Sequence, residues 1–447
     1  MPKKKTALTI EERLQQALVP AEKQPYEVPE NWVWVRLGDV NKYISKSVNP
    51  ISEPDKIFEL YSVPSMVDNY PEIIAGSDIG SSKQSVCKKD VLLCKINPRI
   101  NRVWKVSQFT DNELIASSEW IIIRNNHIDA NYLMYCFQSK YFREFMLSNV
   151  SGVGGSLMRA QPKYVQTYPV PLPPLSEQQR IVERIEELFA KLDEAKERLQ
   201  EVADSFAVRK AAILHKAFTG ELIGKKIEQL VPLESLVDLI KIGPFGSALH
   251  ESDYIENGIP LVNPKHIVQQ HIVPQSKISI SEEKAEELSS YRLKANDIVL
   301  GRRGEMGRCA PVSAREENWI CGTGSMIIRL KEEYDARLYS LILGSQATVT
   351  YLENSAVGST LKNLNEKIVR KIPVPQFDIE EQHEIVRLID DLLAREHKAQ
   401  QATEQALASI DLMKKSILAR AFRGELGTNK ASEASALELL KQVLAEN

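Results

Sequence analysis

Several features common in other classes of protein are scarce or absent in this 447-residue sequence. The five cysteines are Cys87, Cys94, Cys136, Cys309 and Cys321. No two of them form a CxxC pair, which argues against a disulfide framework or a zinc module. No apolar run reaches the length of a transmembrane helix, and the basic residues 1–5 lead into a polar segment instead of the apolar core of a signal peptide. These absences predict a cytoplasmic protein.

Motifs of catalysis are also missing. The glycine-rich segment 152–156 lacks the Gly-Lys-Ser/Thr ending of a phosphate-binding loop. Segments 97–99 and 263–265 lack the second proline of an amino-methyltransferase tetrapeptide. His266 and His271 do not have metal-ligand spacing with the cysteines that follow. Neither a Ser/His/Asp arrangement nor a nuclease-like carboxylate cluster is apparent. The sequence therefore predicts a non-catalytic chain that binds no cofactor and no metal itself.

What dominates the sequence is an internal repeat. Residues 169–222 return as residues 373–426, and 20 of the 54 aligned positions are identical, where chance gives about three. Each copy begins with Pro-Val-Pro, which cannot be helical. A long charged segment follows, in which apolar residues recur at steps of four and three. Such a seam needs a partner helix, so we expect the two copies to pair with each other.

Each helical repeat follows a globular segment, and the two segments have the same order of elements. In the first we expect strands at 31–40, 90–94 and 120–124, a helix at 133–145 and a loop at 151–157. In the second the matching ranges are 231–237, 296–300, 325–329, 338–352 and 355–361. Short helices are expected at both ends of the chain, and Thr9 and Glu12 have the spacing of a capping box.

These patterns predict an α+β protein made of two similar α/β domains, each followed by a long helix. The expected parts are an N-terminal helical extension (1–30), a first domain (31–168), a central helix (169–226), a second domain (227–372), a C-terminal helix (373–427) and a short terminal helix (428–447).

Two pairs of loops offer side chains that suit DNA. Loops 95–102 and 301–308 directly follow matched strands, and arginine there can grip phosphates or pair with guanine. Basic and amide side chains follow the later loops, 151–157 and 355–361, and the Asn and Gln among them can also read adenine. Segment 241–247 is a third candidate. The candidate DNA contacts are Lys95, Arg99, Arg102, Ser156, Arg159, Gln161, Lys163, Lys241, Phe245, Ser247, Arg302, Arg303, Arg308, Thr360, Lys362, Asn363, Asn365 and Lys367.

The overall charge neither requires nor excludes a nucleic-acid partner. The formal net charge is −3, but residues 31–168 hold 16 basic and 13 acidic side chains, whereas residues 176–205 hold 5 and 9. The acidity therefore lies on the central helix, and balanced charge with local basic loops is compatible with DNA binding. Each loop, taken singly, is better explained as an ordinary solvated surface loop, and it is the recurrence of two sets at equivalent places that supports contact with DNA.

Five short motifs occur together in the chain. They are Pro29–Val40, Pro169–Gln178, Ile372–Pro375 with Glu381 and Gln382, Gly243–Ser247, and the Ala-Phe-x-Gly-Glu-Leu that ends each repeat. With these motifs, and over nearly its entire length, the sequence resembles the specificity subunits of type I restriction-modification systems. One departure is Gln376–Ile379, which stands where the first copy has Leu172–Leu175.

The resemblance implies two target-recognition domains separated by two long antiparallel helices, each domain reading one half of an asymmetric bipartite target in double-stranded DNA. It also implies that the helices dock two methyltransferase subunits and that ATP-dependent restriction subunits join them in anti-phage defence. S-adenosylmethionine, ATP and Mg²⁺ would belong to those partners, which methylate adenine at N6 or cleave.

Two alternatives remain open. One is a self-contained methyltransferase or nuclease with duplicated recognition domains. The other is a scaffold whose paired helices bind only proteins. The bases that are read cannot be deduced, because readout depends on loop geometry and DNA shape.

Overall fold

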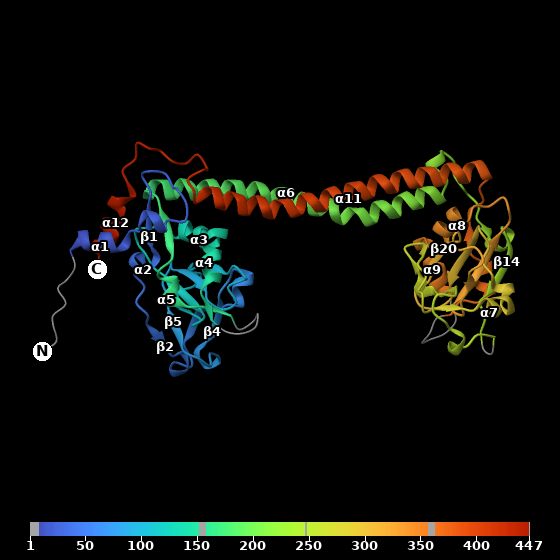
Figure 1. The fold of residues 1–447 in the computed structure, drawn as a ribbon, viewed down its shortest axis with the longest axis horizontal. Helices are drawn as coiled ribbons and strands as arrows, with labels where there is room; N and C mark the ends of the chain where they lie inside the picture. Colours follow the sequence, from blue (N-terminus) through green and yellow to red (C-terminus); the bar gives the residue numbers. More distant parts are fainter. Residues whose placement is uncertain (1–8, 152–157, 246–247, 356–362, 447) are drawn as a thin grey trace. The chain divides into compact units, whose positions relative to one another are not determined.

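A computed structural model describes residues 9–151, 158–245, 248–355 and 363–446. The chain forms two compact units: unit 1 comprises residues 1–199 and 406–447, and unit 2 comprises residues 200–405. Two long helices, α6 (Leu175–Phe218) and α11 (Ile379–Ala421), each contribute residues to both units (Figure 1). They begin at equivalent positions of the two repeats, as the sequence predicts.

Unit 1 is built on two small sheets. The three-stranded sheet places β6 (Val91–Cys94) between β7 (Val103–Lys105) and β9 (Trp120–Ile123), all antiparallel. The five-stranded sheet has the order β2 (Ser47–Val48), β5 (Lys83–Ser85), β8 (Glu113–Ala116), β3 (Ile57–Tyr61) and β4 (Glu72–Ala75). Both β6 and β9 are buried along their whole length, as expected for continuous apolar runs. The strands predicted near residues 90 and 120 are thus confirmed.

Two predictions for unit 1 need correction. The predicted helix at 133–145 is two helices, α3 (Ala130–Gln138) and α4 (Lys140–Ser148), because Ser139 adopts extended backbone (φ −64°, ψ 152°) and its hydroxyl caps α4. The predicted strand at 31–40 ends early: β1 (Val33–Arg36) gives way to a helical turn, α2 (Leu37–Val40). β1 pairs with β12 (Pro169–Leu172), so Pro-Val-Pro lies in a two-stranded edge ladder, where proline is tolerated. The remaining elements are β10 (Val150–Ser151), β11 (Arg159–Ala160) and α5 (Pro162–Val165).

Unit 2 repeats this plan with a different sequence. Its larger sheet has the order β14 (Val237–Ile242), β22 (Ser325–Leu330), β19 (Asp297–Gly301) and β20 (Cys309–Pro311). Its second sheet has the order β18 (Ser279–Ile280), β15 (Ile259–Val262) and β21 (Ile320–Cys321). β15 runs parallel to β21, just as β3 runs parallel to β8. Two further ladders pair β13 (Val231–Pro232) with β23 (Pro373–Val374) and β16 (Ile267–Val268) with β17 (His271–Ile272).

The helices of unit 2 follow the same pattern as those of unit 1. They are α7 (Glu282–Glu287), α8 (Ala336–Leu343), α9 (Gln346–Ser355) and α10 (Glu366–Arg370). The predicted helix at 338–352 is again two helices, because α8 ends at its C-cap, Gly344. The predicted strands near 297 and 325 are confirmed as β19 and β22.

The same polar anchors recur in both units although the sequences differ. In unit 1 the Arg124 guanidinium donates two hydrogen bonds, of 2.7 and 2.6 Å, to the buried Asp90 carboxylate. In unit 2 Arg329 donates two bonds of 2.7 Å to Asp297. Charge-assisted bidentate pairs are both strong and directional, so each fixes the register of its central strands.

The starts of the two long helices are anchored alike. The buried Gln178 carboxamide accepts a hydrogen bond from the Asp129 N–H (2.8 Å) at the N-cap of α3. The buried Gln382 carboxamide accepts one from the Asp335 N–H (2.7 Å) at the N-cap of α8. Each amide also donates to the carbonyl five residues before it. The two helix starts are therefore equivalent despite the sequence departure at Gln376–Ile379.

The long helices pair in antiparallel fashion within each unit. In unit 1, Lys414 of α11 contacts Asp193 of α6, and the next turn pairs Lys196 with Asp411 at 3.7 Å. In unit 2, Arg209 contacts Glu396 at 2.7 Å. The predicted pairing of the two repeats is confirmed.

The two terminal helices pack against each other in unit 1. α1 (Ile10–Ala17) begins with the predicted Thr9–Glu12 capping box. It contacts α12 (Ala436–Ala445), and Arg13 donates a hydrogen bond to the Leu444 carbonyl at 3.2 Å. Leu440 and Val443 of α12 are fully buried. In the parts of the chain that the structure describes, no helix has the length and apolar character needed to span a bilayer.

Candidate nucleic-acid interface

In unit 1 the two candidate loops come together. Loop 95–102 leaves β6, and its backbone pairs with residues 158–160 where the chain returns from the later loop. The Asn97 N–H donates to the Met158 carbonyl (2.7 Å), and the Ala160 N–H donates to the Lys95 carbonyl (2.8 Å). Loop 95–102 and residues 158–160, which are distant in the sequence, thus lie on one surface.

Unit 2 builds the same contact from different residues. Arg303, in the loop after β19, forms a β-bridge with Asn363. The Leu364 N–H donates to the Arg302 carbonyl at 3.0 Å. The predicted correspondence of the two loop pairs is therefore seen in the backbone of both units.

Several basic side chains at these loops form no ion pair with the residues that the structure describes. Arg99 and Arg303 are exposed, and neither forms an ion pair or side-chain hydrogen bond with any residue that the structure describes. Lys163 and Lys367 are exposed as well, and the Lys163 ammonium lies 4.7 Å from the Tyr164 ring centroid. Lys95 is half-buried. These side chains can approach a polyanion without breaking a bond that holds the fold.

Other candidates serve the loops themselves. The Arg102 guanidinium donates to the Ile96 carbonyl (3.5 Å), and Arg302 donates to the Leu364 carbonyl (3.1 Å). Burial, reinforced by the positive charge of Arg303, lowers the pKa of Arg302. Arg308 donates to the Pro264 carbonyl (3.3 Å) and pairs with Glu305. These three arginines hold backbone in place.

Of the remaining described candidates, some already contact other residues of the chain. Arg159 pairs with Glu119 at 3.4 Å, and Asn365 accepts a hydrogen bond from the Ile368 N–H (3.0 Å) as N-cap of α10. The Lys241 ammonium lies 4.4 Å from the Tyr291 ring centroid. Gln161 and Asn363 are half-buried, and Phe245 is 68% exposed. Ser156, Ser247, Thr360 and Lys362 lie outside the described residues.

Sequence reasoning missed Arg143 of α4. Its guanidinium donates to the Pro98 carbonyl and so holds loop 95–102 against the helix. Burial lowers the pKa of Arg143 to about 10. Nothing in the helical pattern distinguishes this arginine from a solvated one, so no sequence signal marks the contact.

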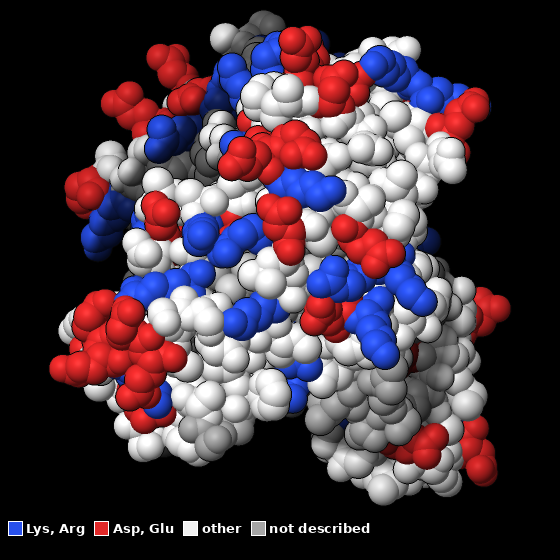
Figure 2. Space-filling model, turned by 90° about the vertical axis from the view of Figure 1, so that its right-hand side faces the viewer, with Lys and Arg blue, Asp and Glu red and all other residues white. Residues whose placement is uncertain are grey.

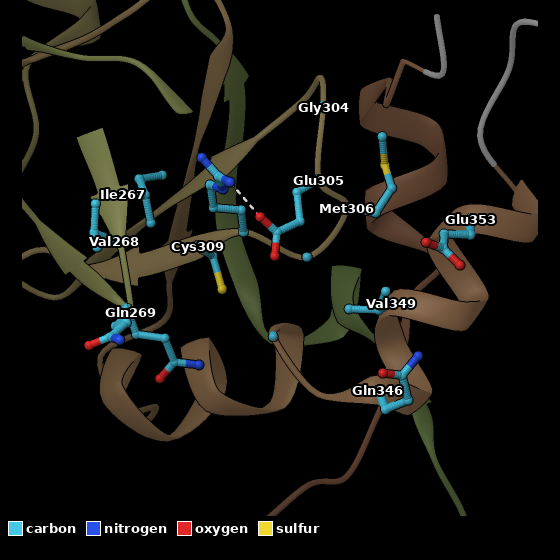
Figure 3. Close-up of a pocket in the computed structure, with 14 residues that line it drawn as sticks. Ile267, Val268, Gln269, Gly304, Glu305, Met306, Cys309, Gln346, Val349 and Glu353 are labelled. Atoms are coloured by element: carbon cyan, nitrogen blue, oxygen red, sulfur yellow. Dashed lines mark hydrogen bonds and ion pairs between the residues drawn. The ribbon is translucent and has the colours of Figure 1, made fainter. Parts of the chain in front are cut away.

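It also missed a cavity of about 750 Å³ in unit 2. Its walls are the β16–β17 hairpin, the loop that leads from Gly304 to Cys309, and the α9 side chains Gln346, Val349 and Glu353 (Figure 3). Glu305 pairs with Arg308, another residue of the lining, and a dashed line at Glu305 marks this ion pair in Figure 3. The lining residues come from segments that are distant in sequence.

Basic and acidic side chains are interspersed on the face shown in Figure 2. A DNA-binding site on this face would therefore depend on individual arginine and lysine side chains more than on an extended region of positive electrostatic potential.

Comparison with known proteins identifies the family. The model of the type I restriction modification DNA specificity domain matches twice, at residues 29–204 and 234–407, which together make up most of the chain. The chain belongs to this family. It is 30% identical over 307 residues to the Escherichia coli type I restriction enzyme EcoBI specificity subunit, a match that spans 62% of this chain and 64% of that relative.

Other members of the family are more distant. The EcoKI specificity subunit of Escherichia coli K12 is 25% identical over 341 residues, covering 71% of this chain and 72% of its own. The MjaVIII specificity subunit of Methanocaldococcus jannaschii is 23% identical over 405 residues, covering 86% and 92%.

Two solved structures share the fold. The HsdS subunit of Thermoanaerobacter tengcongensis superposes with a TM-score of 0.65 at 21% identity, covering 90% of this chain and 99% of its own. A chain from a structure of type I R-M complex assembly and conformational transition gives 0.67 at 22% identity, covering 90% and 100%. The predicted architecture of two similar domains and two long helices is thereby confirmed at the level of the fold.

Proposed function

We propose that this chain is the DNA-specificity subunit of a type I restriction-modification complex and that each unit reads one half of a bipartite, asymmetric target. The observation that carries the proposal is the pair of matched loop contacts, one in each unit. Each presents an arginine, Arg99 or Arg303, whose side chain forms no bond with the described parts of the chain. Two like surfaces with different side chains suit two different half-sites.

The long helices would dock methyltransferase subunits. In unit 1 they leave a groove of about 300 Å³ between α6 and α11, lined by Leu188, Leu192, Met413 and Ile417. Met413 and its neighbour Leu412 are more than half exposed. Apolar side chains gathered on a surface favour a protein partner. The restriction subunits would join this core.

The chain itself would carry no catalytic step and no cofactor. S-adenosylmethionine, ATP and Mg²⁺ would bind the methyltransferase and restriction subunits. This assignment disfavours a self-contained methyltransferase or nuclease.

The test is reconstitution with methyltransferase subunits of a type I system that assemble with this chain. We expect the complex to transfer methyl groups from S-adenosylmethionine to adenines of one bipartite sequence, and each component alone to transfer none. Replacing residues 231–372 with the corresponding domain of a relative should change one half-site only. Methyl transfer by the chain alone, or a change in both half-sites, would contradict the proposal.

A further inference from the structure

The turn of the β16–β17 hairpin has an unusual composition. Val268 pairs with His271, so only Gln269 and Gln270 form the connection. Both have positive φ, 47° and 62°, which is the type I′ geometry that favours Asn-Gly or Gly-Gly. Glutamine at positive φ is disfavoured by contacts of its Cβ with the backbone. Two long amide side chains therefore stand where the backbone alone would select glycine or asparagine.

The two glutamines have different surroundings. The Gln270 carboxamide lies against the end of α8: it donates to the Ser340 carbonyl at 3.5 Å, and a Cβ placed on Gly344 would lie only 2.8 Å from its nitrogen. Gln270 therefore fixes the hairpin to the domain. Gln269 is exposed, lines the cavity, and its carboxamide forms no hydrogen bond within the described ranges (Figure 3). The turn projects the Gln269 side chain outward. Its amide N–H donors and its amide oxygen have no hydrogen-bond partner among the described residues.

The hairpin adjoins the arginine loop of unit 2. It follows the 3₁₀ turn η9 (Pro264–His266), and Arg308 of the loop donates to the Pro264 carbonyl at 3.3 Å. Hairpin and loop form two of the walls of the cavity. Gln269 and Arg308 therefore line the same cavity.

Unit 1 has an exposed apolar side chain in the 3₁₀ turn that follows its matching strand. The 3₁₀ turn η3 (Ser65–Asp68) follows β3 as η9 follows β15. Its Met66 packs against the same apolar cluster as Ile96 of loop 95–102. Here the projecting residue is Val67, which is 89% exposed. The exposed side chain therefore differs in kind between the units, apolar in unit 1 and an amide in unit 2, whereas phosphate contacts require cations in both.

We propose that Gln269 reads a base in the half-site recognised by unit 2, in addition to the contacts made by the arginine loop. This inference rests on the proposed function. A carboxamide that donates and accepts matches the N7 acceptor and N6 donor that adenine presents in the major groove. The base is therefore adenine, at one fixed position of the half-site.

The test uses the complex with its methyltransferase subunits and maps methylated sequences for Gln269→Gly and Gln269→Asn. Glycine and asparagine both suit the positive φ of the turn, so both variants keep the hairpin and should melt no lower than the wild type. We expect Gln269→Gly to accept other bases at one position of the unit 2 half-site, with discrimination there reduced roughly 10- to 100-fold. Gln269→Asn keeps a carboxamide on a shorter stem and should lose less discrimination. The other half-site stays unchanged.

The matched control is Gln400→Ala, which removes an exposed glutamine of α11. Among the described residues its amide bonds Glu404 alone, at 3.0 Å, and the target of this variant should equal that of the wild type. An unchanged target for Gln269→Gly, or a change in the half-site of unit 1, would overturn the role of Gln269 while bipartite methylation by the wild type leaves the proposed function standing. Methylation by the wild type without any sequence preference would contradict the proposed function itself.

Discussion

Two neighbouring arginines in unit 2 show how differently adjacent residues can act. Arg302 is half-buried and its guanidinium donates to the Leu364 carbonyl, so it joins the two loops of the candidate interface. Arg303 is exposed and forms no ion pair with the described residues. The same side-chain chemistry therefore supports the fold at one position and is free for a ligand at the next.

Substituting each arginine by alanine should separate these roles. Arg303→Ala should weaken DNA binding of the assembled complex by about tenfold and reduce its salt dependence, because a cation near phosphate is lost, with no change in unfolding. Arg302→Ala should lower the free energy of unfolding by about 1–3 kcal/mol, since the Leu364 carbonyl loses its partner. Fluorescence anisotropy across a salt series and urea denaturation measure the two effects. Equal losses of stability in both variants would contradict the distinction.

Sequence reasoning located Arg303 but could not separate it from Arg302. Both follow a predicted strand within one loop, and the position of the loop was correct. Which arginine turns inward depends on where residues 363–365 return, a contact between segments that are distant in the sequence. Gln269 was missed for a related reason: its turn geometry shows in the backbone φ and carries no glycine or asparagine signal.

At the scale of elements, the two helix starts depend on buried glutamines. Gln382 accepts from the Asp335 N–H and donates to the Glu333 and Phe377 carbonyls, at 2.9 and 3.0 Å. It therefore joins the first turn of α11 to the segment that caps α8. This contact explains the glutamine of the Glu-Gln motif that the two repeats share.

Gln382→Ala should leave one buried donor and two acceptors without partners and lower the free energy of unfolding of unit 2 by about 2–4 kcal/mol. Hydrogen exchange during urea unfolding, followed on peptides from α8, measures the loss. The exposed Gln400→Ala serves as the control and should unfold as the wild type does. An unchanged unfolding midpoint for Gln382→Ala would show that the contact does not hold the helix start.

Element boundaries were less predictable than element type. Long apolar runs identified the central strands, and the repeat identified both long helices, because these signals extend over many residues. The breaks at Ser139 and Gly344 were not foreseen, since the apolar spacing continues across each of them. A hydroxyl cap and a glycine decide those breaks locally, and periodicity does not detect them.

At the scale of the whole molecule, α6 is a single helix of 44 residues that contributes to unit 1 up to Leu199 and to unit 2 from Gln200. The internal repeat alone predicted this continuity and the pairing with α11. What the repeat could not predict is which side chains the loops of each unit present, because loops of equal position carry different residues.

The length of α6 should therefore set the number of unspecified base pairs between the half-sites. Adding four residues after Leu199 lengthens the helix by about 6 Å and rotates the residues beyond the insertion by roughly 40°. In B-DNA, with about 10 base pairs in 34–36 Å, this corresponds to one or two base pairs. We expect the methylated target of the insertion variant to keep both half-sites and gain a longer spacer. If the helices served only to bind proteins, the spacer would remain unaltered or the complex would fail to assemble, and sequencing the methylated adenines distinguishes these results.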